Sequence, residues 1–158
     1  TALPFYALSN PLSVQSTTGG GNDYSDWIAL FPGVGTKTGL EDDPDADGIV
    51  NGVENFFGTN PDAFSTGLEA GVVSEGAGTT FTFTHPQNAT PADDLTGFYQ
   101  WSLDLENFYG DGVANGGTTV GFSAETNTPS PGITTVTATI TGTVADRLFV
   151  VAGVTQAP

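Results

Sequence analysis

DPDADGIVNGVE is the sequence of residues 43–54, and its acidic residues recur at alternate positions. The segment satisfies the pattern D-x-[DN]-x-[DN]-G-x5-E, in which a loop curls around a calcium ion, at every specified position. Calcium takes about six to eight oxygen ligands, which a short loop supplies from alternate side chains. The clustered carboxylates of this segment would repel one another without a cation. We therefore interpret residues 43–54 as a calcium-binding loop.

Each position of this loop has an expected role. Gly48 stands where the loop turns sharply and a side chain would obstruct it. Calcium is favoured over magnesium, which usually keeps several waters, and over zinc, because the chain has no Cys and no His nearby. The alternative is a solvated acidic turn before a short helix. The predicted ligands are the side chains of Asp43, Asp45 and Asp47, the carbonyl of Ile49, Asn51 directly or through water, and both oxygens of Glu54.

Apolar stripes on both sides of the loop predict two short helices. Asp23 is placed to cap the first helix, which should end at Pro32-Gly33. The second helix follows the loop directly and should end at Gly58. The positions that form the two stripes are Tyr24, Trp27, Ile28, Phe31, Val50, Val53 and Phe57.

The acidic loop resembles the EF-hand-type calcium loops of dockerins and of thrombospondin type 3 repeats. With the flanking stretches DWIALFPG, residues 26–33, and NFFGTNP, residues 55–61, it also resembles a module of secreted bacterial surface proteins. There the calcium segment precedes a β-sandwich and the ion is structural. The resemblance covers about residues 24–62 specifically. Dockerins carry two such loops, whereas this chain has one good copy, so the resemblance does not extend to cohesin binding.

The chain is strongly acidic, which restricts its partners. Its 158 residues carry a formal net charge of −16, with Lys37 and Arg147 as the only basic residues apart from His85. Such a field repels nucleic acid and anionic lipid, so we expect neither partner. No apolar run is long enough to insert into a membrane. A calcium loop of this type suits millimolar calcium, so we expect an extracellular or cell-surface protein after removal of a signal peptide.

Beyond about residue 68 the apolar residues recur at every second position, which is the spacing of a strand and not of a helix. The stretches 79–84 and 135–141 alternate cleanly, and turn residues separate several such strands. This pattern predicts a mainly β fold, an immunoglobulin-like, fibronectin-like or jelly-roll-like sandwich, with a small helical calcium-binding segment before it. The expected divisions are an extended arm and Gly-rich joint at 1–22, the helical calcium segment at 23–62, and the sandwich at 63–158.

The N-terminal arm has two interpretations. Pro4 and Pro11 exclude a central strand, so the arm either packs on its own domain or adds to a neighbour's sheet edge. Phe5 and Tyr6 are then candidate assembly contacts. The second interpretation predicts a homo-oligomer or polymer joined through strand edges and the arm.

We find no catalytic constellation in the sequence. His85 is the only histidine and precedes Pro86, which favours a surface or turn position, and Ser102 with Asp104 lacks a nucleophile elbow. The sequence therefore predicts a non-enzymatic, secreted, calcium-binding structural protein that assembles into a filament, tube or surface layer. The alternative is a carbohydrate-binding or anchoring module, with Tyr99 and Trp101 as glycan contacts. Alternation places both residues on one face of a strand, and that face could equally be part of the sandwich core.

Overall fold

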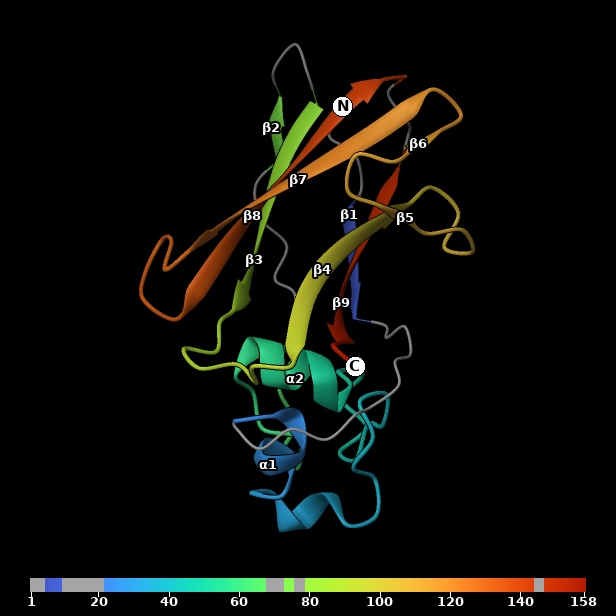
Figure 1. The fold of residues 1–158 in the computed structure, drawn as a ribbon. Helices are drawn as coiled ribbons and strands as arrows, with labels where there is room; N and C mark the ends of the chain where they lie inside the picture. Colours follow the sequence, from blue (N-terminus) through green and yellow to red (C-terminus); the bar gives the residue numbers. More distant parts are fainter. Residues whose placement is uncertain (1–4, 10–21, 68–72, 76–78, 144–146) are drawn as a thin grey trace. The chain divides into compact units, whose positions relative to one another are not determined.

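The computed structural model describes residues 5–9, 22–67, 73–75, 79–143 and 147–158. Within them the fold is mainly β and sandwich-like, as the sequence predicts, with antiparallel sheets in the strand orders β1-β9-β4-β5 and β2-β3-β8-β7-β6 (Figure 1). The helices are α1 (Tyr24–Ile28) and α2 (Asn51–Phe57), with a 3-10 turn at Pro32–Val34. The strands are β1 (Phe5–Ser9), β2 (Val73–Glu75), β3 (Thr79–Pro86), β4 (Leu95–Ser102), β5 (Tyr109–Gly110), β6 (Ala114–Asn115), β7 (Thr118–Thr126), β8 (Ile133–Gly142) and β9 (Leu148–Gln156).

The chain forms two compact units, and the first holds the sandwich core. This unit comprises residues 1–8, 68–85 and 99–151. Alternate residues of strands from both sheets point inward, as the period of two requires, and exclude water between the sheets. The wholly or almost wholly buried members of this core are Phe83, Trp101, Val120, Val136, Ala138, Ile140, Leu148 and Val150.

The second unit holds the predicted helices and the acidic loop. It comprises residues 9–67, 86–98 and 152–158. Asp23 caps α1 by accepting a hydrogen bond from the amide of Asp26 at 2.9 Å. Gly58 ends α2 in the left-handed conformation, with φ of 77°. The start of α1 and the end of α2 therefore lie where the sequence predicts them. The end of α1 does not, because this helix ends at Ile28, before the predicted stop at Pro32-Gly33, where a separate 3-10 turn forms.

The start of α2 is fixed by the chain that precedes the loop. No side chain caps this helix; instead the amides of Asn51 and Gly52 donate to the carbonyls of Asp42 and Leu40, at 2.9 and 3.0 Å. These bonds satisfy donors that a helix N-terminus leaves without an intrahelical partner. As a result, residues 40–42 and the first turn of α2 hold both ends of the acidic loop.

The compact units differ from the sequence-based division in two respects. Residues 86–98 and 152–158, which we expected in the sandwich, belong to the unit that contains the loop. Part of the N-terminal arm, β1, is the edge strand beside β9 in the chain's own sheet. The side chains of Phe5 and Tyr6, like residues 1–4 and 10–21, lie outside what the structure describes. None of the described helices is long and apolar enough to cross a membrane.

Gly52 provides the first test of this packing. A Cβ atom at residue 52 would lie 2.7 Å from Val154 Cγ2 and 2.9 Å from Leu40 Cδ2. Overpacking of this kind costs about 1–3 kcal/mol, which exceeds the helix-propensity gain of about 1 kcal/mol from replacing glycine. We expect Gly52→Ala to lower the free energy of unfolding in urea by about 1 kcal/mol. Adding Val154→Ala should offset part of that overpacking, so a double-mutant cycle without coupling between these sites would contradict the packing described.

Candidate metal centre

The acidic loop is shaped by its own carboxylates. Asp43 accepts hydrogen bonds from the amides of Ala46, at 2.8 Å, and Gly48, at 3.1 Å. Asp47 accepts one from the amide of Ile49 at 2.7 Å. These bonds turn the backbone around the acidic side chains. Two residues take positive φ to permit the turn, Ala46 at 61° and Gly48 at 90°.

Three carboxylates meet at the centre of this loop. Asp43, Asp45 and Asp47 each present one oxygen, and the three oxygens lie within 4.8 Å of one another. All three side chains are half-buried. Burial raises the pKa of Asp45, and its acidic neighbours Asp47 and Asp43 add to the rise. The sequence spacing predicted this meeting of Asp43, Asp45 and Asp47, and together they could hold a metal ion.

Glu54, the last predicted ligand, has no exposed surface and is outside this group of three, but the charges of Asp47, Asp45 and Asp43 act on it. Its Oε1 atom accepts a hydrogen bond from Thr59 Oγ1 at 3.2 Å, whereas its Oε2 atom has no partner. Burial, followed by repulsion from Asp47 and Asp45, raises the pKa of Glu54 to about 8. A buried carboxylate with an unpaired oxygen is unfavourable unless a proton or a cation neutralises it.

The unpaired buried oxygens test whether these residues suit a cation. They are Asp45 Oδ2, Asn51 Oδ1 and Glu54 Oε2, and all three belong to loop positions predicted to supply ligands. Buried polar atoms almost always have a partner in folded proteins. Three buried oxygens without a hydrogen-bond donor therefore indicate that another group, such as a cation, binds their lone pairs. A hard cation with carboxylate and carbonyl ligands meets that need without any donor from the protein.

Asn51 has an additional role that the ligand pattern does not show. Its Nδ2 atom donates to the carbonyls of Lys37 and Gly39, at 3.0 and 2.9 Å, so only Oδ1 remains for an ion or a bridging water. Lys37 Nζ in turn donates to the carbonyl of Asp43 at 2.9 Å. Ile49, whose carbonyl is the remaining predicted ligand, has a buried side chain. Asn51 and Lys37 thus fasten the loop to the segment before it.

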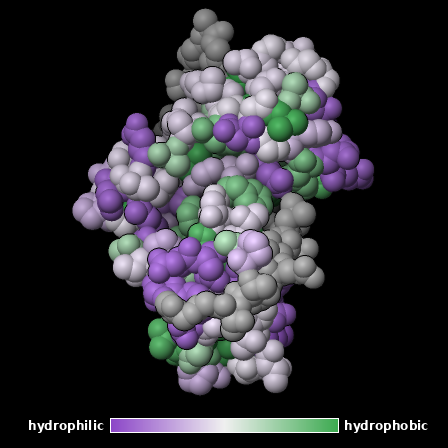
Figure 2. All heavy atoms as spheres, in the orientation of Figure 1, coloured by the Kyte–Doolittle hydropathy of each residue, from purple (hydrophilic) through white to green (hydrophobic). Residues whose placement is uncertain are grey.

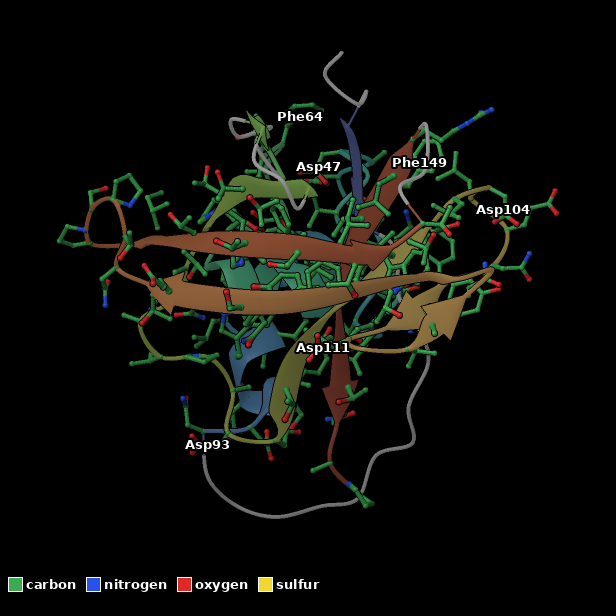
Figure 3. All side chains as sticks on the ribbon, turned by 90° about the horizontal axis from the view of Figure 1, so that it is seen from above. Asp47, Phe64, Asp93, Asp104, Asp111 and Phe149 are labelled. Carbon is green, nitrogen blue, oxygen red and sulfur yellow. The ribbon has the colours of Figure 1, made fainter. Side chains whose placement is uncertain are left out.

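Sequence reasoning missed two residues that complete the centre. Ser65 donates its amide to Asp47 Oδ2 at 2.7 Å, and Thr59 contacts Glu54. Both lie beyond α2, where the chain returns to the loop; Phe64, beside Ser65 in the sequence, is labelled near Asp47 in Figure 3. No local pattern marks either residue, because a single threonine or serine after a helix is common.

The two predicted glycan contacts lie in and beside the sandwich core. Trp101 is completely buried in the sandwich core, with Tyr99 packed against the same cluster. Stacking on a sugar ring needs an exposed aromatic face, which Trp101 lacks. On the face that Figure 2 shows, hydrophobic residues are scattered among hydrophilic ones.

His85 also differs from its predicted position. It is 1% exposed at the end of β3, and its Nε2 atom lies 2.6 Å from the hydroxyl of Tyr99. The alternating period places residue 85 on the same inward face as Phe83, which explains the burial. Ser102 and Asp104 contact each other at 3.0 Å, but Asp104 also accepts hydrogen bonds from the amides of Glu106 and Asn107. Ser102 and Asp104 therefore form a turn.

Comparisons with known proteins identify no relative of this chain. Neither the scan of family models, nor the search of curated proteins, nor the search of solved structures found a match.

The raised pKa of Glu54 predicts an unusual pH dependence. Because the folded chain holds this proton more tightly than the unfolded chain, stability in calcium-free buffer should fall as pH rises from about 4.5 to about 8. One pKa unit corresponds to about 1.4 kcal/mol, so the fall should amount to about 1–4 kcal/mol. Urea unfolding across this range measures it. Glu54→Gln, which keeps the shape and removes the titration, should flatten the slope; an equal slope in both proteins would contradict the assignment.

The positive φ angles predict opposite effects at two neighbouring positions. A left-handed conformation costs a non-glycine residue about 1–2 kcal/mol. Ala46→Gly should therefore raise the stability of the metal-bound loop by about 1 kcal/mol, whereas Gly48→Ala should lower it by a similar amount. Thermal unfolding with calcium present tests both. A shift of the same sign in both variants would be inconsistent with this loop geometry.

Proposed function

We propose that residues 43–54 bind one calcium ion and that this ion stabilises the unit built around α2. The observation that carries the proposal is the group of buried oxygens without partners, Asp45 Oδ2, Asn51 Oδ1 and Glu54 Oε2. They belong to the same loop as the three carboxylate oxygens within 4.8 Å of one another. A divalent cation among them neutralises the repulsion and satisfies the oxygens together.

Calcium suits this donor set better than other common metals. The donors are carboxylates, a carboxamide and a backbone carbonyl, which are hard oxygen ligands. Magnesium demands a nearly regular octahedron and retains several waters, whereas this loop offers many protein oxygens. Zinc prefers sulfur and nitrogen ligands, and the loop contains neither Cys nor His.

The ion acts on stability through the folded state. Asp43, Asp45 and Asp47 come together only when the loop is closed, so calcium binds the folded unit in preference to the unfolded chain. A ligand present at about ten times its dissociation constant adds roughly 1.4 kcal/mol of stability. Extracellular modules bind calcium with dissociation constants of about 10⁻⁴ to 10⁻³ M, and we infer that this loop works at the millimolar calcium levels found outside the cell.

The wider role that we propose is that of a secreted, non-enzymatic structural protein that associates with copies of itself. Two observations support a role without catalysis: His85 is buried in the sandwich core, and Asp104 is occupied in a turn. Subunits with a net charge of −16 repel one another, and bound calcium lowers that repulsion while it rigidifies the unit around α2. Assembly into a filament, tube or surface layer requires such rigid subunits.

Amide hydrogen exchange with calcium and with excess chelator tests the calcium-binding role. Calcium should slow exchange of residues 40–60 at least tenfold, because the loop and the first turn of α2 close around the ion. Asp45→Asn should weaken this protection, whereas Asp93→Asn, which removes the same charge at an exposed position in the same unit, should retain it. Equal exchange with millimolar calcium and with chelator would rule out the proposed site.

A further inference from the structure

The outer edge of β7 is covered along only part of its length. On one side β7 pairs with β8 over nine residues, Thr118↔Gly142 to Thr126↔Thr134, and the two strands form a long ribbon in Figure 1. On the other side β6 pairs only with Thr118 and Thr119. No strand within the described residues pairs with the rest of this outer edge, which is residues 120–126.

Two hydrogen bonds identify the backbone groups that face outward. The amide of Phe122 donates to Asp111 Oδ1 at 2.8 Å, and the carbonyl of Val120 accepts from the amide of Gly112 at 2.9 Å; Figure 3 labels Asp111. In an antiparallel ladder the outward direction recurs at every second residue. Ala124 and Thr126 therefore also direct their backbone groups away from β8.

Some of these outward groups are used within the chain and some are not. Thr126 retains only its amide, because its carbonyl accepts from Thr128 Oγ1 at 3.5 Å. In the part of the chain that the structure describes, no bond is made by the Phe122 carbonyl, the Thr126 amide, or the amide and carbonyl of Ala124. This set of two donors and two acceptors is symmetric about Ala124.

We propose that the outer edge of β7 pairs antiparallel with the same edge of a second copy, about a two-fold axis at Ala124. The two Ala124 residues exchange two hydrogen bonds. Each Thr126 amide donates to the Phe122 carbonyl of the other copy. All the unused groups are then satisfied, while the Phe122 amide and the Thr126 carbonyl keep their present partners. This inference rests on the proposed self-association and names its interface.

Side-chain chemistry along this edge permits the pairing. Residues 123–126 are exposed, and they contain neither the Lys nor the Pro that protects many edge strands. The one charge, Glu125, would lie opposite Ser123 of the other copy, so like charges do not face each other directly. After Thr126 the chain turns at Asn127, where φ is 58°. The paired strand thus ends before it reaches Gly112, which covers Val120.

A charge-exchange experiment tests this two-fold pairing. Residue 124 is its own partner, so Ala124→Lys and Ala124→Glu should each weaken the dimer by placing like charges opposite each other, and a mixture of the two variants should restore it as a heterodimer. Thr139→Lys supplies a matched control, because it adds the same charge at an exposed position on β8 away from the edge. Sedimentation of the full chain with calcium measures association, and circular dichroism checks that each variant folds.

We expect wild-type and Thr139→Lys proteins to dimerise alike, and each position-124 variant alone to associate at least tenfold more weakly. Exchange of the Ala124 and Thr126 amides should slow as wild-type concentration rises.

Unimpaired association of Ala124→Lys would overturn this interface and leave self-association itself intact. A wild-type protein that stays monomeric at every concentration would overturn both. Calcium protection of residues 40–60 is a separate readout that neither result changes.

Discussion

The repulsion among the carboxylates of residues 43–54 is the constraint on which the second unit depends. Asp43, Asp45 and Asp47 meet within 4.8 Å, and Glu54 is buried beside them with a pKa raised to about 8. Folding gathers these groups because the loop closes onto residues 37–42 and α2 packs behind it. A bound cation turns this unfavourable concentration of charge into a stabilising one, since it binds the closed loop preferentially.

The loop also organises segments far from it in the sequence. Asn55, on α2, accepts a hydrogen bond from the buried amide of Ala92 at 2.9 Å, and Gly52 lies against Val154 of β9. Asp94 accepts bonds from the amide of Tyr24, at 2.8 Å, and from Gln156 Nε2, at 2.6 Å. Residues from the middle and the end of the chain therefore surround α2, so an ion that fixes the start of this helix stabilises contacts well beyond the loop.

Sequence patterns predicted the features that depend on neighbouring residues. The acidic spacing placed Asp43, Asp45 and Asp47 together, Asp23 and Gly58 marked helix ends, and alternation located β3 and β8. Contacts between distant segments were not predictable: Ser65 and Thr59 reach the acidic loop only because the chain returns after α2. Alternation placed Tyr99 and Trp101 on one face without saying whether that face is buried, and strand pairing resolved it.

Calorimetric titration with calcium in buffers of different ionisation enthalpy tests the central claim most directly, because it measures ions bound and protons released together. Because the pKa of Glu54 is raised to about 8, its carboxyl group carries a proton at pH 6. A calcium ion that binds this group must displace that proton. We predict one calcium per chain, with close to one proton released at pH 6 and less as the pH approaches 9. No binding at millimolar calcium, or binding without proton release at pH 6, would contradict the account.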